Sequence, residues 1–192
     1  AVQFKPDFID AWYGLGFELR QQGKTEEAVA AYQQVVKLKP DFTDAWQNLG
    51  VSLGNLGRME ESVDAFSQAI KLRPDQAISW YGLGNVLGKQ KQAGGEAIAA
   101  YRQAIRLKPD FTDAWQNLGV SLGDQGRMEE AIEAFLQAIK LKPDHEAAWC
   151  GLGWSYGKKG KMEEAIAAFR QAVKLKPDNA DAWHNLGLIL DE

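Results

Sequence analysis

The sequence predicts an all-α protein built from stacked antiparallel helix pairs, and three observations lead to this prediction. Tryptophans recur every 34 or 35 residues, each with a leucine three positions later and a glycine four positions later. The segment PDFTDAWQNLGVSLG occurs at residues 40–54 and again, letter for letter, at residues 109–123. Neither helix of such a unit can bury its apolar stripe alone, so neighbouring units must stack. The tryptophans are Trp12, Trp46, Trp80, Trp115, Trp149 and Trp183.

Each unit is predicted to contain two helices. The first helix should begin at the aspartate that follows a proline, because aspartate is a good N-cap. It should end at a glycine in the left-handed conformation. The second helix opens with acidic pairs such as Glu60–Glu61 and closes with Lys-Leu-Lys-Pro, so the charges match the helix dipole at both ends. The turn glycines are Gly23, Gly57, Gly126 and Gly160.

Composition narrows the class of protein. With 192 residues, 45% of them hydrophobic, the chain can bury a sizeable core. Its 22 basic and 26 acidic residues are interspersed, so no basic stripe for phosphates is present and we expect no nucleic-acid partner. No apolar run approaches the roughly 18 residues of a membrane span, so we expect no membrane insertion and a soluble protein. Nothing fixes the compartment, for which cytoplasmic is the simplest expectation.

The recurring Trp..Leu-Gly, Ala...Tyr/Phe and Pro pattern resembles the tetratricopeptide repeat family over essentially the whole chain. The resemblance implies a right-handed α-solenoid in which the first helix of each pair lines a concave groove. We interpret residues 1–192 as a single array that belongs to a longer protein, because the chain starts inside a unit. The array comprises the tail of a preceding repeat (1–8), repeats at 9–42, 43–76, 77–111, 112–145 and 146–179, and a lone helix (180–192).

Helical geometry separates predicted core positions from free ones. At about 100° per residue, Trp, Leu, Gly and the next apolar residue share one stripe. Positions two before the tryptophan, and one, two, five and nine after it, face the opposite way. At two after the tryptophan, glycine and asparagine alternate without an evident packing need. Either these glycines clear space for a ligand backbone, or duplication of a two-unit ancestor copied them. The residues are Gly14, Asn48, Gly82, Asn117, Gly151 and Asn185.

The candidate groove residues lie at these free positions. Asparagine amides can bond the main chain of an extended peptide, aromatic side chains anchor interfaces, and aspartates favour basic ligand groups. Solvated asparagines, partly buried aromatics and first-turn aspartates that follow the helix dipole remain the plain alternatives. The peptide-binding set is Asp10, Tyr13, Phe17, Asp44, Gln47, Asn48, Tyr81, Asn85, Asp113, Gln116, Asn117, Trp154 and Asn185.

Two branches of the family give sharper expectations. The run Asp-Ala-Trp-Gln-Asn-Leu-Gly looks like the repeats of O-GlcNAc transferase and its plant relatives, whose superhelix carries an asparagine ladder. Here Gly14, Gly82 and Gly151 break that ladder. The chaperone-binding carboxylate clamp uses groove lysine, arginine and asparagine, but those basic positions are Asp, Gln, Tyr or Gly in this chain. We therefore reject an acidic C-terminus as the ligand.

No catalytic chemistry is predicted. His145 and His184 lack partners for a triad or a metal site, so we expect both to be solvated surface residues. The single cysteine, Cys150, cannot form an internal disulfide. We expect no enzymatic activity, no cofactor and no metal.

The leading hypothesis is a non-enzymatic protein–protein interaction scaffold that binds an extended peptide or a partner helix in its groove. The alternative is the substrate-recruiting arm of a glycosyltransferase whose catalytic domain lies outside this sequence. A consensus array without a natural ligand is disfavoured by the irregular third unit and the varied groove residues.

Two irregularities bear on assembly. The third unit has Lys91 where other units place the turn glycine, and Gly94–Gly95 follow later. Either the turn is longer, or the first helix continues and the glycine pair becomes a hinge that permits exchange between chains. The lone last helix presents Trp183, Leu186 and Leu190 without a partner, so we expect end-to-end stacking or homo-oligomers through uncapped ends.

Overall fold

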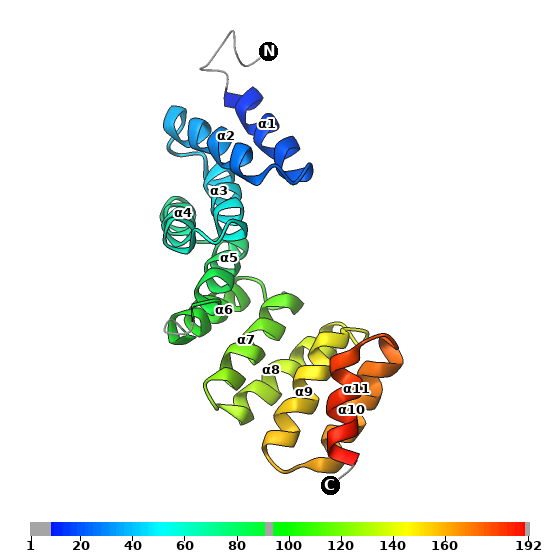
Figure 1. Cartoon of the computed structure of the whole chain (residues 1–192). Helices are drawn as coiled ribbons and strands as arrows, with labels where there is room; N and C mark the ends of the chain where they lie inside the picture. The colour runs from blue at the N-terminus through cyan, green and yellow to red at the C-terminus, as the bar shows by residue number, and fades with distance from the viewer. Residues whose placement is uncertain (1–8, 91–93, 191–192) are drawn as a thin grey trace. The chain divides into compact units, whose positions relative to one another are not determined.

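The computed structural model describes residues 9–90 and 94–190, and within them it is entirely helical apart from turns (Figure 1). This confirms the predicted all-α helical-repeat fold. The helices are α1 (Ile9–Gln21), α2 (Thr25–Leu38), α3 (Thr43–Asn55), α4 (Met59–Leu72), α5 (Ala77–Gly88), α6 (Gly94–Leu107), α7 (Thr112–Asp124), α8 (Met128–Leu141), α9 (Glu146–Lys158), α10 (Met162–Leu175) and α11 (Ala180–Leu190).

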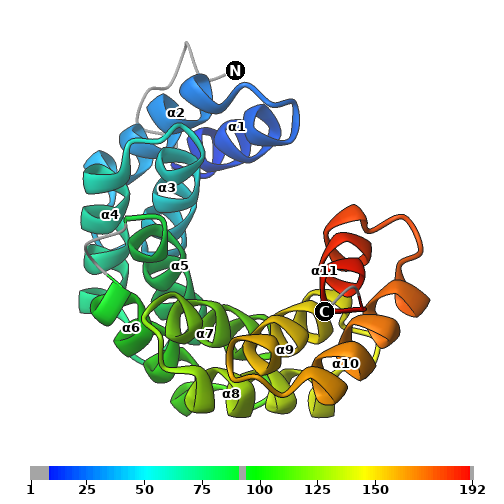
Figure 2. The same ribbon diagram turned by 60° about the horizontal axis from the view of Figure 1, so that its bottom comes forward.

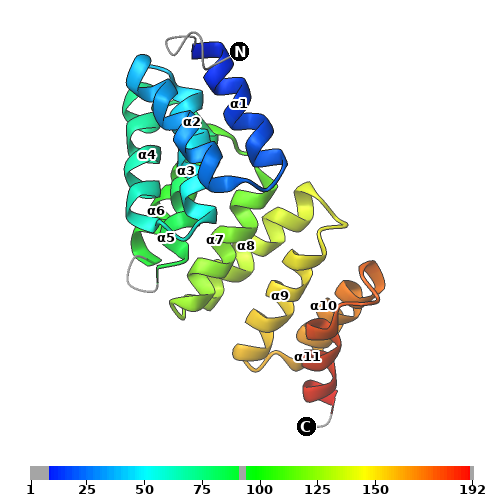
Figure 3. The same cartoon turned by 45° about the horizontal axis from the view of Figure 1, so that its top comes forward.

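The helices form two compact units, Ala1–Ala93 with α1–α5 and Gly94–Glu192 with α6–α11. Within each unit the odd-numbered helices make one layer and the even-numbered helices the other (Figure 2). Short turns join consecutive helices, as the run from α7 to α11 shows in Figure 3. Successive odd-numbered helices also touch one another, α3 with α5, α7 with α9 and α9 with α11. We call the outward surface of this layer the odd-helix face.

The turns inside four of the helix pairs, α1/α2, α3/α4, α7/α8 and α9/α10, have the predicted glycine. Gly23, Gly57, Gly126 and Gly160 all have φ between 71° and 76°, a left-handed conformation that residues with a side chain rarely adopt. At the third of these turns the N–H of Gly126 donates to the carbonyl of Gly123 at 2.9 Å, and the next N–H reaches back to Leu122. These bonds satisfy carbonyls that the end of the helix would otherwise leave unpaired.

The predicted aspartate N-caps are wrong. Asp41 lies in a turn closed by the bond from the N–H of Phe42 to the carbonyl of Lys39, and α3 begins only at Thr43. Pro40 fixes φ at the second position of that turn, so the chain must complete the turn before a helix can start. The N-cap residues of α3, α5, α7 and α9 make no side-chain capping bond. By contrast, the side chain of Asn179 accepts the N–H of Ala182 at 2.9 Å.

The tryptophans hold turns in place and are less buried than predicted. The indole N–H of Trp46 donates to the carbonyl of Pro40, six residues earlier, at 2.8 Å. The same bond recurs at 2.9 Å for Trp80, Trp115, Trp149 and Trp183. The indoles are half-buried except that of Trp183, which is 52% exposed. The alanines just before the tryptophans take the core positions instead: Ala45, Ala114, Ala148 and Ala182.

The alternating glycines have a packing role that a single helix could not reveal. A Cβ placed on Gly82 would lie 2.3 Å from the ring of Phe66, and one on Gly151 would lie 2.3 Å from the ring of Phe135. Each ring belongs to the even-numbered helix of the preceding pair, so these glycines face a neighbouring repeat rather than an open surface. The equivalent Gly14 has nothing within 4 Å. The expectation that these glycines serve no packing need was therefore wrong for Gly82 and Gly151.

The third pair departs from the other pairs as its sequence indicated. Helix α5 ends at Gly88 and α6 begins at Gly94, so the alternative in which the first helix continues to the glycine pair is wrong. A Cβ on Gly94 would lie 2.7 Å from the Gln125 side chain, which fits a close approach at the start of α6. Lys91 lies outside the described residues.

Candidate peptide-binding surface

The predicted groove residues all lie on odd-numbered helices, and they divide between the two compact units. The first unit carries Asp10, Tyr13 and Phe17 on α1, Asp44, Gln47 and Asn48 on α3, and Tyr81 and Asn85 on α5. The second carries Asp113, Gln116 and Asn117 on α7, Trp154 on α9 and Asn185 on α11. Each set is described within its own unit.

Tyr13 and Asn48 join α1 to α3. The amide of Asn48 donates to the hydroxyl oxygen of Tyr13 at 2.9 Å. The Tyr13 ring stacks on Phe42 with centroids 5.0 Å apart and meets Tyr32 edge-on at 5.9 Å. Burial raises the pKa of the Tyr13 hydroxyl, and the nearby charge of Asp44 raises it further. Both groups are thus engaged in holding neighbouring repeats together.

Gln47 makes the corresponding contact between α3 and α5. Its side-chain amide donates to the hydroxyl of the buried Ser79 at 2.7 Å and also contacts the amide of Gln76. Gln116 and Asn117 occupy the same positions on α7 and are likewise half-buried. The positions one and two after the tryptophan were predicted to be free, but they lie partly between helices because successive odd-numbered helices touch.

His145 is not the solvated residue that we expected. Its side chain is only 15% exposed, and its Nε2 lies 3.5 Å from a carboxylate oxygen of Asp113. His145 precedes α9 at the N-cap position, from which a side chain reaches back to the preceding odd-numbered helix. The repeat register carried this signal, since residues at the equivalent position also contact the preceding odd-numbered helix: Phe42 with Tyr13, Gln76 with Gln47, and Asn179 with Glu146. His184 is exposed, as expected.

Cys150 sits one residue after Trp149 and is half-buried. Its sulfur lies 3.2 Å from a carboxylate oxygen of Glu146 and 3.7 Å from the amide of Asn179. Burial, followed by the bond to Glu146, raises the pKa of the Cys150 thiol to about 12. A thiol in this setting stays protonated and is a poor nucleophile.

We therefore expect Cys150 to react slowly with thiol reagents in the folded protein. With a pKa of about 12 in place of 9.0, roughly a thousandth of the usual thiolate is present near neutral pH. Iodoacetamide labelling followed by mass spectrometry should be about a hundredfold or more slower before urea is added than after. Similar rates in the two conditions would mean that the thiol is not shielded in this way.

An exposed apolar row crosses the odd-helix face of each unit at the position five after the tryptophan. Its members are Phe17 and Val51 in the first unit and Val120, Trp154 and Leu188 in the second, each between 36% and 55% exposed. Seven residues earlier, on the same side of four of these helices, stand the exposed aspartates Asp10, Asp44, Asp113 and Asp181. Seven residues of helix rise about 10 Å, so an acidic row and an apolar row run side by side.

Trp154 is the largest side chain of this row. Its ring packs against α7, where a Cβ on Gly123 would lie 2.9 Å away. The ammonium of Lys158 lies 5.6 Å from the ring centre, within range of a cation–π contact. The ring is therefore fixed on one side while 36% of the residue stays exposed to a ligand.

Asn185 differs from the other asparagines of the candidate set. Its amide donates to the carbonyl of Asp181 in its own helix at 2.8 Å. Among the described residues, no group of three or more histidine, cysteine, aspartate or glutamate side chains is arranged to hold a metal ion. No described helix has the length and apolar character needed to cross a bilayer.

Comparison with known proteins accounts for the repeated architecture. One tetratricopeptide repeat profile matches residues 48–110 and 81–146, and a second matches residues 18–57 and 155–191. A search of curated proteins found no match. A crystal structure of MamA protein is 28% identical, covers 90% of this chain and 93% of its own, and has a TM-score of 0.78.

Two further structures have the same fold at lower identity. MamA from Desulfovibrio magneticus RS-1 is 23% identical, covers 90% of this chain and 97% of its own, and has a TM-score of 0.82. YrrB, described as a tetratricopeptide protein with an unusual peptide-binding site, is 23% identical. It covers 95% of this chain and 94% of its own, and has a TM-score of 0.78. With its 34-residue spacing, its helix pairs and these matches, the chain belongs to the tetratricopeptide repeat family.

Proposed function

We propose that this protein is a non-catalytic interaction scaffold whose odd-helix face binds a peptide or a partner helix. The observation that carries the proposal is the exposed apolar row of Val120, Trp154 and Leu188 on three successive odd-numbered helices. Exposed apolar side chains that line up in this way mark an interaction surface more often than single scattered ones do. Trp154, which is 36% exposed and packs against α7, is the expected anchor.

The acidic row specifies the ligand further. Asp113 and Asp181 lie one row away from Val120 and Leu188, about 10 Å along the helices. A helix about 10 Å wide that lies across α7, α9 and α11 reaches both rows, whereas an extended strand follows one of them. We therefore favour a basic amphipathic helix, with apolar side chains toward Trp154 and lysine or arginine toward the aspartates.

The relatives support the proposal in outline. YrrB has the same fold and is described as having a peptide-binding site. The proposal does not rest on an asparagine ladder, because the amide of Asn48 is bonded to Tyr13 and that of Asn185 to its own helix. The glycosyltransferase-arm alternative, which began from a resemblance to ladder-bearing repeats, thus gains no support from these amides.

The test compares substitutions of exposed apolar residues on the odd-numbered helices with one on an even-numbered helix. Peptides selected against the wild-type protein from a displayed library of 16-residue sequences are measured by fluorescence anisotropy against the double variant Val120→Ser/Trp154→Ser. Removing two central apolar contacts should weaken binding about tenfold or more. Leu136→Ser is the matched control, because Leu136 is 42% exposed on the even-numbered helix α8 while Val120 is 43% exposed.

The same selection decides against the proposal if the peptides bind the double variant as tightly as wild type, or if Leu136→Ser alone removes binding. Asn48 and Tyr13 are unsuitable for this test because their mutual bond links α1 to α3, so a change there alters the fold as well as the surface. Selected peptides should also be enriched in basic residues, and acidic selected peptides would contradict the role given to the aspartates.

A further inference from the structure

The even-numbered side of the first unit contains a cavity that the proposed function does not use. Helices α2, α3 and α4 line this cavity, which is open to solvent and has a volume of about 650 Å³. Its apolar part is formed by Val36, Trp46, Leu49 and Leu53, and Glu61 and Asp64 line it from α4. A volume of this size is typical of small-ligand and side-chain binding sites. The cavity lies between two even-numbered helices, away from the odd-helix face.

The chain contains a second copy of this cavity 69 residues later. Helices α6, α7 and α8 surround it, but its volume is only about 170 Å³. The corresponding apolar residues are Ile105, Trp115, Leu118 and Leu122, and Glu130 and Glu133 take the places of Glu61 and Asp64. Residues at corresponding repeat positions line the two cavities. The residues that differ between the two linings can therefore explain why the second cavity is smaller.

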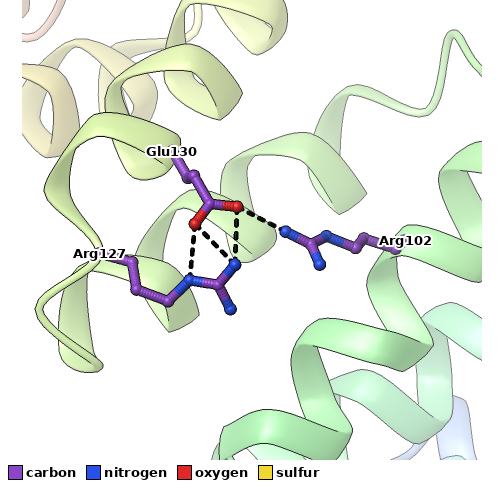
Figure 4. A network of polar contacts seen from close by, with 3 residues as sticks. All are labelled: Arg102, Arg127 and Glu130. Atoms are coloured by element: carbon purple, nitrogen blue, oxygen red, sulfur yellow. Dashed lines mark hydrogen bonds and ion pairs between the residues drawn. The ribbon is translucent and has the colours of Figure 1, made fainter.

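An arginine spans the smaller cavity. Arg102 of α6 donates to a carboxylate oxygen of Glu130 on α8 at 2.7 Å, and Arg127 pairs with the same carboxylate through two bonds of 2.7 Å (Figure 4). The hydrogen bonds from Arg127, with the added charge of Arg102, hold the pKa of the Glu130 carboxyl below its usual value. One glutamate thus receives two guanidinium groups.

The larger cavity has the carboxylate but not the second arginine. Arg58 pairs with Glu61 through bonds of 2.6 and 2.5 Å, just as Arg127 pairs with Glu130. The counterpart of Arg102 is Gln33, which carries no charge. A carboxylate offers about four acceptor positions, so Glu61 can accept a second guanidinium as Glu130 does. Its side chain is 51% exposed and therefore accessible from outside.

We propose that the cavity between α2, α3 and α4 binds an arginine side chain of a partner protein, with the guanidinium on Glu61 and the neighbouring apolar group over Trp46, Leu49 and Leu53. Arginine fits better than lysine because its planar fork matches a carboxylate and its stem packs on apolar surface. Lys37 also lines the cavity from α2, so the guanidinium belongs beside Glu61 and Asp64 on α4. This site does not depend on the function proposed for the odd-helix face.

The probe is the blocked dipeptide N-acetyl-Arg-Phe-amide, titrated into the whole protein while the methyl signals of Leu49 and Leu53 and the Trp46 indole signal are followed by NMR. We expect these signals to move, and those of Leu118, Leu122 and Trp115 to stay. N-acetyl-citrulline-Phe-amide has the same shape without the charge, and should bind about five-fold more weakly, as expected for a partly exposed charge pair. The proposal would be overturned if the two dipeptides bound equally well, or if only the NMR signals of Val120 and Trp154 shifted.

Two exchanges between the copies test the role of the missing arginine. In Gln33→Arg the new guanidinium should occupy Glu61 from within the protein. Binding of the dipeptide, followed at the Leu49 and Leu53 signals, should then be about five-fold or more weaker. Arg102→Gln should open the second cavity, so that the dipeptide binds there and now shifts the NMR signals of Leu118 and Leu122. Both positions are exposed and each variant has the residue of its counterpart, so folding should be unaffected. Unchanged binding in Gln33→Arg, or no response at Leu118 and Leu122 in Arg102→Gln, would count against the site.

Discussion

We expect Phe135→Ala to lower the free energy of unfolding by about 3–5 kcal/mol, a large fraction of the total stability of an ordinary domain. The Phe135 side chain is 2% exposed. A Cβ added to Gly119 would lie 2.8 Å from its ring, and one added to Gly151 would lie 2.3 Å from it. The ring therefore fills a space bounded by α7 and α9, and neither glycine has a side chain that could collapse into the cavity.

Leu136→Ala is the matched control, because Leu136 is the next residue of the same helix and is 42% exposed. Its effect should stay within about 0.5 kcal/mol. Urea unfolding followed by circular dichroism measures both variants, with hydrogen exchange reporting whether α7 and α9 lose protection together. A loss of less than about 1 kcal/mol in Phe135→Ala would mean that the ring does not hold these helices together.

The architecture was predictable because the features that define it are local or strictly periodic. The turn glycines need one backbone conformation, and four of them have it. The tryptophan spacing sets the repeat length, and the acidic starts of α4, α8 and α10 agree with the helix dipole. The N-cap prediction was wrong because Pro40 and Asp41 form a turn, so the helix starts only after that turn. The sequence already contained this competing signal.

The candidate surface was predicted only in part, because a helical wheel describes one helix and ignores the next. It identified the side that exposes Phe17 and Trp154. It could not show that Gln47 bonds Ser79 on the following odd-numbered helix, or that His145 lies beside Asp113. Those contacts depend on how closely successive repeats approach, which is a property of the stack.

The cavity on the even-numbered side was likewise predictable only in part from the sequence. The exchange of Gln33 for Arg102 is visible when the sequence is compared with itself 69 residues later. That Arg102 on α6 reaches Glu130 on α8 is not visible in this way, because it depends on how closely these two helices approach in the stack. Periodicity thus finds positions that differ between copies, and packing decides which of those differences face a common space.

Gly82→Ala and Gly14→Ala should change stability in opposite directions, although both replace the glycine two residues after a tryptophan. Alanine in a helix interior is favoured over glycine by about 1 kcal/mol, and Gly14 has nothing within 4 Å, so Gly14→Ala should be stabilising by up to that amount. At Gly82 the new methyl group would lie 2.3 Å from the Phe66 ring, which is itself 2% exposed. Overpacking of this kind costs about 1–3 kcal/mol, so the net effect should be destabilising.

The double variant Gly82→Ala/Phe66→Leu separates this steric cause from any other role of the glycine. Phe66 is enclosed from both sides, since a Cβ on Gly50 would also lie 2.9 Å from its ring, so the ring has little room to move away. Leucine is shorter and leaves space for the alanine methyl group, so the cost of Gly82→Ala should fall when Phe66 is already replaced. Urea unfolding of the four proteins in this cycle gives the coupling. If Gly82→Ala stabilises as much as Gly14→Ala, the ring yields and the glycine must be explained by the history of the repeat.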